Sequence, residues 1–414
     1  MRYWVFEALL HVVLEGTYSN LYLKDHLQEL PVNERAAATR IFYGTIQNYR
    51  FCESVWKPCA TRKVDRKIAV LLTMAVYELL FMENTPAYTI INETVALAAK
   101  VKPGAKGFVN AVLRKVQEGE IQWPADPLER LAMETSVPLW LIRLWNAQYG
   151  SKETEEMARA TNQILPVYVR LNPAYDPAIM DQDPAFEKAG KLWKYNGREI
   201  FRHPFYRKGV ISVQDPGSYE IAEYLQPRPG DKVLDVCAAP GTKTMAVMEL
   251  MKNKGSVDAL DLHEHRVKLI ENDAQRLHLQ GISARQQDST DLEGFGLYDR
   301  VLCDVPCTGY GVLARKPDIK LRMEPTDMDS LIPVQKQILE QAGEHVKEGG
   351  TLVYSTCTAN RKENEKQVEA FLKAHPDFQL EAQQTLLPGK GADGFYMARL
   401  VRSGRAGQTP GEPV

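Results

Sequence analysis

Along the first 150 residues, apolar positions recur at spacings of three and four. This is the period of one face of an α-helix, and it predicts helices over 4–14, 33–50, 67–82 and 90–101. Turn formers, Thr85-Pro86 and Pro103-Gly104, follow the last two of them, and a further helix start comes after Gly150. We therefore expect an all-helical domain over residues 1–150.

Near residue 164 the pattern changes. The stretch PVYVRLNP, residues 166–173, alternates and is rich in β-branched residues, which predicts a strand. The polar stretch 176–189 is expected to be helical, and short strand-like pieces follow up to residue 213. We expect a linker helix and a small α/β, RRM-like subdomain over residues 151–228.

From about residue 229, short apolar runs alternate with helical stretches. The runs are KVLDVC (232–237), SVDALD (256–261), ISARQQ (282–287), RVLCDV (300–305) and TLVYST (351–356). Such alternation predicts a parallel, doubly wound sheet, and ligands of such sheets bind beyond the carboxyl ends of the strands. We expect this Rossmann-like α/β domain over 229–402. The tail, 403–414, has almost nothing to bury and is expected to be disordered.

Composition agrees with a multidomain soluble protein. The chain has 414 residues, 44% of them hydrophobic and 25% charged, and six cysteines without a paired CxxC pattern. The longest apolar run, 68–82, contains Thr73 and Glu78 and is too short to span a bilayer. No histidine pair has metal-ligand spacing. We expect a cytoplasmic monomer that binds neither metal nor membrane.

One segment is much more basic than the net charge of -2 implies. Residues 188–208 contain seven lysines and arginines against one acid, with aromatic residues between them. Such a surface can contact phosphates and stack on bases, but it can equally be a solvated face over a small sheet. The residues that we expect to contact RNA are Arg170, Asn172, Lys194, Arg198 and Arg202.

Acidic residues follow four of the five predicted strands, and a thiol follows the fifth. They are Asp235, Asp261, Asp288, Asp304 and Cys357. One polar residue at a strand end is ordinary, but five that meet at one edge of a sheet indicate a site. A lone cysteine at a strand end is more often a packed thiol than a catalytic one, but two cysteines at adjacent strand ends beside an aspartate favour catalysis.

The first of these loops, DVCAAPGTKT, is neither a GxGxxG fingerprint nor a phosphate-binding P-loop. It suits a nucleoside cofactor with an amino-acid end better than a pyrophosphate. Asp261 is placed to bind ribose hydroxyls, and Asp288 could hold an adenine amino group, although it could also be a turn residue.

These loops resemble the motifs of a known enzyme family. DVCAAPGTKT, DVPCTG and YSTCT…ENE look like the cofactor site and the two-cysteine site of the Sun family of RNA cytosine-C5 methyltransferases. RAAATRIFYGT and AYTIINETVALAAKVKPGAKGFVNAVLRKV resemble the NusB-type helical domain of its 16S rRNA-methylating branch. The resemblance extends to about residue 402. Two departures are Thr242, where a second glycine is usual, and Pro216-Gly217, where residues such as alanine are usual.

The resemblance implies that S-adenosylmethionine is the cofactor and 16S rRNA the substrate. It implies that Cys357 is the nucleophile and that Cys307 assists product release. Asp304 would hold the cytosine edge, and Lys243 would reach the base or the acids of the site. The implied cofactor residues are Asp235, Cys237, Ala238, Ala239, Pro240, Gly241, Thr242, Lys243, Asp261, Asp288 and Asp304.

The chemistry needs these residue types. Carbon 5 of cytosine is a poor nucleophile until a thiolate adds to carbon 6, which is covalent catalysis. A thiol with a pKa near 8.5 is mostly protonated at neutral pH, and a nearby lysine would raise its thiolate fraction. Cys237 and Cys303 are expected to pack in the core, Cys52 and Cys59 to be structural, and Glu363-Asn364-Glu365 to cap a helix.

Three alternatives stay open at this point. A tRNA cytosine-C5 methyltransferase would use the same site, and only the helical domain argues against it. An RNA-binding ribosome assembly factor with an inactive methyltransferase domain would be expected to lack Cys307, Cys357 or Asp304, all of which are present. A small-molecule methyltransferase would leave the helical domain and the basic segment without a use.

Overall fold

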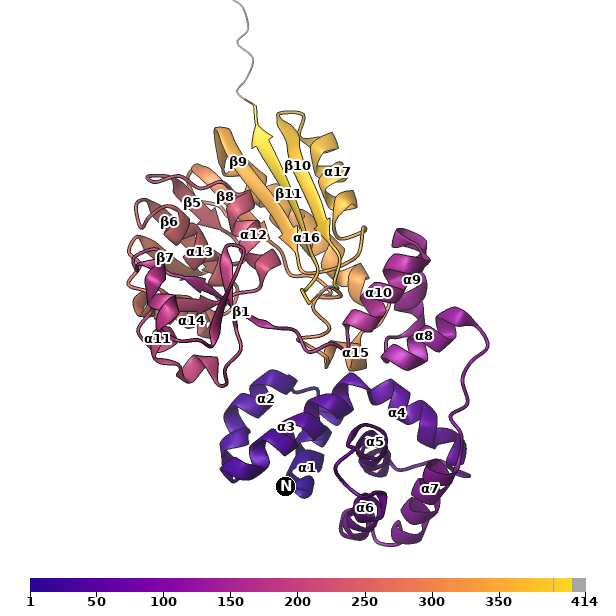
Figure 1. Ribbon diagram of the computed structural model, residues 1–414. Coiled ribbons are helices and arrows are strands. Elements are labelled where there is room, and N and C mark those ends of the chain that lie inside the picture. The colour runs from indigo at the N-terminus through magenta and orange to yellow at the C-terminus, as the bar shows by residue number, and fades with distance from the viewer. Residues whose placement is uncertain (390, 404–414) are drawn as a thin grey trace, which may run out of the picture. The chain divides into compact units, whose positions relative to one another are not determined.

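The computed structural model describes residues 1–389 and 391–403. They form two compact units (Figure 1). The helical unit comprises Met1–Ile164 and an inserted segment, Leu313–Pro325. The α/β unit, called the methyltransferase unit once its activity is established below, comprises Leu165–Val312 and the described residues from Thr326 onward. Sequence patterns did not reveal that residues 313–325 join the helical unit. The finer boundaries at 150 and 228 stay predictions, and the expected disordered tail lies, apart from Ser403, outside the described residues.

The helical unit contains all four of the helices that the apolar period predicts. Its helices are α1 (Arg2–Leu14), α2 (Ser19–His26), α3 (Val32–Gln47), α4 (Tyr49–Trp56), α5 (Arg66–Phe81), α6 (Ala87–Val101), α7 (Lys106–Glu118), α8 (Pro127–Thr135), α9 (Leu139–Tyr149), α10 (Ser151–Ala160) and, in the inserted segment, α15 (Ile319–Arg322). The apolar run at 68–82 forms α5, a largely buried helix. Asp65 begins α5 by accepting hydrogen bonds from the backbone N–H groups of Lys67 and Ile68.

The inserted segment is anchored in the helical unit by a buried lysine. Lys320 is 1% exposed. Its Nζ donates to the backbone oxygen of Thr135 at 2.8 Å, to Oδ1 of Asn162 at 2.7 Å and to the backbone oxygen of Gln47 at 3.3 Å. Thr135 and Gln47 are the last residues of α8 and α3, where helix dipoles favour a cation. Burial lowers the pKa of Lys320 well below its usual value.

A small antiparallel sheet begins the α/β unit. Its strand order is β2 (Phe186–Ala189), β3 (Leu192–Tyr195), β1 (Val167–Leu171) and β4 (Ile211–Val213). The strand predicted at 166–173 is confirmed as β1. The helix predicted over 176–189 is wrong, because Pro184 lies inside the stretch and interrupts the backbone hydrogen bonding that a helix needs. Residues 177–182 form a short 3-10 helix, and the rest of the stretch supplies β2, which pairs with β3.

The main sheet has seven strands in the order β10-β11-β9-β8-β5-β6-β7. Their bounds are β5 (Lys232–Asp235), β6 (Ser256–Asp261), β7 (Ile282–Gln286), β8 (Tyr298–Asp304), β9 (Val346–Thr356), β10 (Phe378–Leu386) and β11 (Phe395–Arg402). The five predicted strands, β5 to β9, are parallel, whereas β10 and β11 are antiparallel. The strand order reverses between β5 and β8, which is where sheets of this kind bind their ligands.

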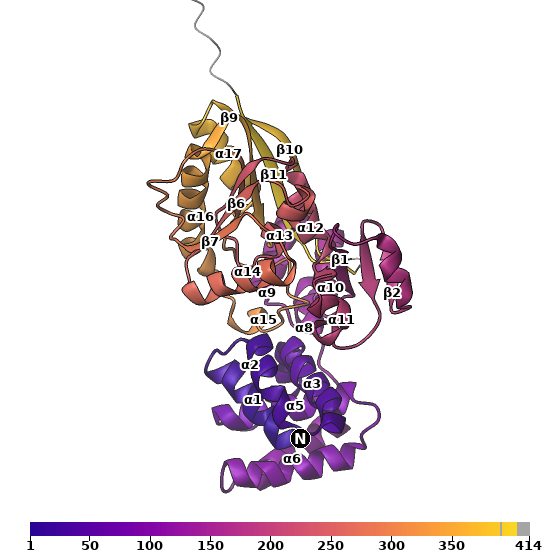
Figure 2. The same cartoon turned by 90° about the vertical axis from the view of Figure 1, so that its left-hand side faces the viewer.

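Helices cover both faces of the main sheet. Figure 2 shows α16 (Asp327–Glu344) and α17 (Glu365–Ala374) along one face, and α12 (Pro216–Tyr224) and α13 (Thr242–Leu250) on the other. On the first face, Ile338 and Phe371 pack with Leu234, Val301 and other strand residues into a continuous apolar core. α14 (Glu264–Arg276) packs beside α13 against β6 and β7. The fold class is thus an all-α N-terminal part followed by a Rossmann-like α/β domain, as the sequence predicts.

Candidate active site

The ends of β5, β8 and β9 bring the predicted acids and thiols to one edge of the main sheet. β5 and β8 pair so that Asp235 lies opposite Leu302, and β8 and β9 pair so that Asp304 lies opposite Ser355. Cys307 and Cys357 follow three and two residues after this last pair. Residues far apart in the chain therefore meet because parallel strands end at the same edge.

The first loop joins β5 to α13 through a tight turn. Gly241 has φ +104°, which favours glycine, and an added Cβ would lie 3.3 Å from Cα of Ile270. Asp235 is buried, and its Oδ2 accepts from the Thr244 hydroxyl at 2.6 Å. Among the described residues, nothing donates to its Oδ1. Burial raises the pKa of Asp235 to about 7.

Asp261 and Asp288 lie at the ends of the next two strands, as predicted. Oδ1 of Asp261 accepts from the backbone N–H of His263 at 3.1 Å, and Oδ2 lies 3.5 Å from Arg266. Asp288 is exposed, and one oxygen accepts from both the backbone N–H and the hydroxyl of Thr290. These hydrogen bonds lower the pKa of Asp288. Both carboxylates keep an oxygen able to accept from a ligand.

A charged pair lies between the cofactor loop and the cysteines. Nζ of Lys243 is 2.7 Å from Oδ2 of Asp304, and the Ser355 hydroxyl donates to Oδ1 of Asp304 at 2.7 Å. Burial opposes the charge of Lys243, but the attraction of Asp304 outweighs it, so the pKa of Lys243 is raised. Lys243 is therefore a permanent cation, and its charge also acts on Cys357.

The two cysteines are in contact. Their Sγ atoms are 3.3 Å apart, so the two thiols form a hydrogen bond and no disulfide. The hydrogen bond with Cys357, burial, and the negative charges of Cys357 and Glu363 together raise the pKa of Cys307 well above its usual value. Cys303 is fully buried in the apolar core and Cys237 packs against it, as expected.

A buried carboxylate holds the two cysteine-bearing loops together. Thr308, next to Cys307, and Thr358, next to Cys357, bond to each other through their hydroxyls at 2.7 Å. Glu363 accepts from the backbone N–H of Thr308 at 3.0 Å and from its hydroxyl at 2.6 Å. Gln335 donates to Glu363 at 2.9 Å and also to the backbone oxygen of Pro306 at 2.9 Å.

The expectation that Glu363-Asn364-Glu365 caps a helix therefore needs correction. Asn364 occupies the N-cap position of α17, but its side chain makes no capping hydrogen bond. It instead accepts from the Thr356 hydroxyl at 2.6 Å and donates to the backbone oxygen of Thr358 at 2.9 Å. The repeated Cys-Thr dipeptide and the nearby acidic residues could have indicated this hydrogen-bond network from the sequence. The prediction of a helix cap did not use them.

Two glycines permit close packing around the cysteines. A Cβ on Gly311 would lie 2.3 Å from the backbone oxygen of Gly394 and 2.9 Å from that of Cys357. Any side chain at 311 would therefore displace the loop that carries Cys357. At Gly217, one of the two departures from the family pattern, a Cβ would lie 2.5 Å from the Phe395 ring. The glycine makes room for that ring, which lies 6.0 Å from Nζ of Lys243.

The structure does not place Arg170 and Asn172 on the surface, so both fail as RNA contacts. Each is 3% exposed. Arg170 forms a buried, two-pronged ion pair with Glu249 of α13, at 2.5 and 3.2 Å. The Asn172 amide donates to the backbone oxygens of Gly209 and Leu277 at 3.0 and 3.1 Å. Both side chains hold the small sheet to the main domain.

The remaining predicted RNA contacts are accessible. Arg198 and Arg202 are exposed and Lys194 is half-buried. Arg202 pairs with Glu199 at 3.3 Å, and Phe201 beside it is 62% exposed. Trp193 and Tyr195 are buried, so they belong to the core of the small sheet and cannot stack on bases. These three basic residues stay predictions.

Residues 1–389 and 391–403 offer neither a metal-binding cluster nor a membrane-spanning helix. No group of three or more histidine, cysteine or acidic side chains there is arranged to hold a metal ion. No helix in this range combines the length and the apolar character needed to cross a membrane.

Fold and site together define a Rossmann-like methyltransferase joined to a NusB-type helical domain. A family model described as 16S rRNA methyltransferase RsmB/F matches residues 222–401. The NusB family model matches residues 1–118. Both parts of the family resemblance seen in the sequence are thereby confirmed.

Individual proteins match over almost the whole chain. The probable ribosomal RNA small subunit methyltransferase B of Bacillus subtilis (strain 168) is 38% identical, with 96% of this chain and 98% of that protein covered. The corresponding protein of Vibrio cholerae is 31% identical, with 95% and 96% covered. The crystal structure of PH0851 has a TM-score of 0.82 at 25% identity and covers 96% of this chain and 97% of that one. The chain therefore belongs to the ribosomal RNA small subunit methyltransferase B family.

As a member of this family, the protein is an RNA methyltransferase that uses S-adenosylmethionine. The cofactor loop fits that molecule, since the amino-acid end of S-adenosylmethionine carries an ammonium group. Oδ1 of Asp235 is a buried acceptor without a donor among the described residues, and a bound cation beside it would offset the burial that raises its pKa. Asp261 and Asp288 offer acceptors for ribose hydroxyls and the adenine amino group.

Proposed function

We propose that this enzyme methylates carbon 5 of a cytosine in 16S rRNA through a covalent bond between Cys357 and carbon 6 of the base. The observation that carries the proposal is the pair of thiols 3.3 Å apart, next to the Lys243–Asp304 ion pair. Two thiols at adjacent strand ends suit a reaction that needs both a nucleophile and a base.

The charges around the two thiols favour Cys357 as the nucleophile. The Lys243 cation interacts with Cys357, which raises the pKa of Lys243, whereas the negative charge of Glu363 raises the pKa of Cys307. A cation beside Cys357 suits a thiol that must attack, and an anion beside Cys307 suits one that stays protonated until it is needed. This polarity agrees with the roles that the family resemblance implies.

The residues would act in sequence on the base. The Cys357 thiolate forms a bond to carbon 6, the carbon 5–carbon 6 double bond opens, and carbon 5 becomes nucleophilic. Asp304 holds the N3 and N4 edge and stabilises the protonated ring. S-Adenosylmethionine, when bound, supplies the methyl group. Cys307 takes the proton from carbon 5, the double bond re-forms, and the carbon 6–sulfur bond breaks to release Cys357.

The site also accounts for when the second base becomes available. Two of the effects that raise the pKa of Cys307 come from Cys357: their hydrogen bond and the negative charge of Cys357. Both disappear once the Cys357 sulfur is bonded to carbon 6. The pKa of Cys307 therefore falls in the adduct, the only stage at which its thiolate is needed.

RNA access to this chemistry requires an unstacked cytosine. The helical domain over 1–150 and the small subdomain over 151–228, with Lys194, Arg198 and Arg202, would present it. The substrate part of the proposal is supported by the 16S rRNA description of the matching family model and by the names of the relatives. We further propose that the protein acts in the cytoplasm as a monomer.

The test uses cytosine tritiated at carbon 5. Deproteinised 16S rRNA and a tRNA control, both so labelled, are incubated with the protein and S-adenosylmethionine. We expect tritium release to water and 5-methylcytidine in digested 16S rRNA only. Methyl transfer to tRNA alone would show that 16S rRNA is not the substrate. Methylation without tritium release would overturn the position on the base. RNA binding without methyl transfer would favour the assembly-factor alternative.

A further inference from the structure

The helical unit carries a basic surface outside the RNA contacts that the sequence predicts. It consists of the loop 57–67 and the turn 100–106, which together contain eight basic residues and one acid. The basic residues are all exposed and are Lys57, Arg62, Lys63, Arg66, Lys67, Lys100, Lys102 and Lys106. We call this the 57–67/100–106 surface. It is a local excess in a chain whose net charge is -2.

The two segments are held side by side. Nζ of Lys102, after α6, lies 2.9 Å from Oδ2 of Asp65, before α5. The Arg62 guanidinium lies 4.9 Å from the ring centroid of Phe108 in α7. Asp65 is the acid of this surface, and it is already engaged with Lys102 and with the N-terminus of α5. It therefore leaves little negative charge to neutralise the other cations.

Most of the positive charge on this surface is uncompensated. Lys57 pairs with Glu53 at 2.9 Å. Lys102 pairs with Asp65, and within residues 1–389 and 391–403 no acid pairs with the other six: Arg62, Lys63, Arg66, Lys67, Lys100 and Lys106. Arg66, Lys67 and Lys106 moreover lie in the first turns of α5 and α7, which contain no acid and where the helix dipole disfavours cations. These residues oppose local helix stability, so an external anion explains them better than folding does.

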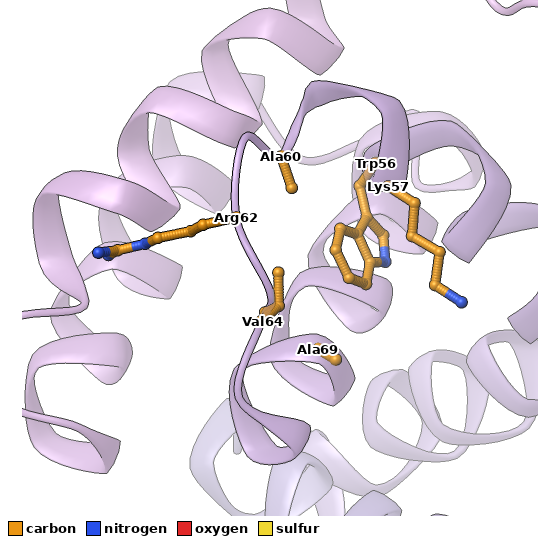
Figure 3. A pocket seen from close by; sticks show the side chains of 6 residues that line it. All are labelled: Trp56, Lys57, Ala60, Arg62, Val64 and Ala69. Carbon is orange, nitrogen blue, oxygen red and sulfur yellow. The ribbon is translucent and has the colours of Figure 1, made fainter.

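A shallow hollow lies within the surface. Its volume is about 250 Å³, and Trp56, Lys57, Ala60, Arg62, Val64 and Ala69 line it. Figure 3 shows Lys57 and Arg62 on opposite sides, with the small side chains of Ala60 and Val64 between them. Trp56 is 2% exposed and its indole N–H donates to the Thr73 hydroxyl, so the ring is fixed and cannot stack on a base. The hollow is therefore a concave surface flanked by positive charge, and it has no group that could recognise the identity of a base.

We propose that the 57–67/100–106 surface binds the sugar-phosphate backbone of the RNA substrate. Exposed, unpaired lysines and arginines around a hollow without base-reading groups are suited to phosphates and give sequence-tolerant affinity. The choice of RNA as the partner rests on the proposed function. The surface supplies affinity for a long RNA, while the active site of the other unit selects the cytosine.

The experiment compares two sets of four substitutions that remove the same charge. The first is Lys63→Gln, Arg66→Gln, Lys67→Gln and Lys106→Gln. The control set, at other exposed lysines, is Lys24→Gln, Lys152→Gln, Lys254→Gln and Lys373→Gln. Binding to deproteinised 16S rRNA is measured by filter retention across salt concentrations in a Cys357→Ala background, so that catalysis does not enter. Helical circular dichroism checks that each protein folds.

For the first set we expect the Kd at low salt to rise at least about tenfold, and the slope of log Kd against log salt to fall by about three, relative to the control set. A further set keeps the charge by exchanging lysine and arginine at the same four positions: Lys63→Arg, Arg66→Lys, Lys67→Arg and Lys106→Arg. It should retain wild-type binding. If the two glutamine sets have equal Kd values and slopes, this surface does not bind the RNA. The same result would be obtained if the surface bound an acidic protein instead, and it would overturn the proposal in that case too. If the wild-type protein binds RNA through this surface but transfers no methyl group, only the proposed function would be overturned.

Discussion

Two strand ends of the methyltransferase unit carry the same dipeptide, Cys-Thr, in opposite electrostatic surroundings. Cys357-Thr358 at the end of β9 lies within the influence of the Lys243 cation. Cys307-Thr308 after β8 lies against the buried Glu363 carboxylate. Identical dipeptides thus lie beside charges of opposite sign. In the proposed mechanism, these neighbours, more than the cysteines themselves, determine which thiol attacks.

The difference between the two cysteines is tested most directly by removing each of them in turn. Cys357→Ala should lower methyl transfer by roughly 10⁴-fold or more, because no other group can form the bond to carbon 6. No RNA adduct should appear on a denaturing gel. Cys59→Ser, at a partly exposed cysteine of the helical unit, is the control and should retain activity. If the Cys357→Ala protein still forms an adduct, Cys307 is the nucleophile and Cys357 is the base.

Cys307→Ala should behave differently from Cys357→Ala. The nucleophile is intact, so the bond to carbon 6 forms, but the proton on carbon 5 has no base. We expect turnover to fall about 10²- to 10⁴-fold and a covalent RNA–protein complex to accumulate. The complex should resist denaturation and disappear in the double variant with Cys357→Ala. Loss of both turnover and adduct would mean that Cys307 is needed for attack.

Glu363→Gln should weaken the asymmetry while preserving the side-chain shape. It removes charge-assisted hydrogen bonds to Thr308, so we expect turnover to fall about ten- to a hundredfold. The negative charge of Glu363 raises the pKa of Cys307, and therefore its loss should lower that pKa and move the Cys307-dependent limb of the pH–rate profile to lower pH.

The matched control is Glu369→Gln, which neutralises an exposed acid on α17 that pairs with Lys366 at 2.7 Å. Its pH–rate profile should match that of the wild type. If Glu363→Gln lowers turnover without moving the profile, the carboxylate positions the loop but does not tune the thiol.

Thr308→Val is the mildest change. It removes a hydroxyl that bonds to Thr358 and Glu363 but leaves the backbone N–H bond to Glu363. A neutral hydrogen bond contributes about 0.5–1.5 kcal/mol, so turnover should fall about two- to tenfold. Thr385→Val, whose hydroxyl bonds to Glu365 in α17 and not to the cysteine loops, should leave turnover unchanged. Equal kcat values for the two variants would remove Thr308 from the support of the site.

Sequence reasoning succeeded where the signal is local. The helices and parallel strands follow from the spacing of apolar residues, and the acids and cysteines of the site follow from the strand ends. It failed where a partner is distant. The basic character of Arg170 indicated a surface contact, but Glu249, 79 residues away, makes it a buried ion pair. Thr308 and Thr358 meet across 50 residues, so the role of Glu363 could not be read from its neighbours in the chain.

The inserted segment imposes an order of events during synthesis. The helical unit ends its first stretch at Ile164 but is completed only by Leu313–Pro325. At about 5–20 residues per second, the ribosome needs roughly seven to thirty seconds to make the chain between them. During that interval the oxygens of Gln47, Thr135 and Asn162 lack the hydrogen bonds from Nζ of Lys320. The helical unit, although its synthesis begins first, therefore cannot be completed until all of Leu165–Val312 has been made.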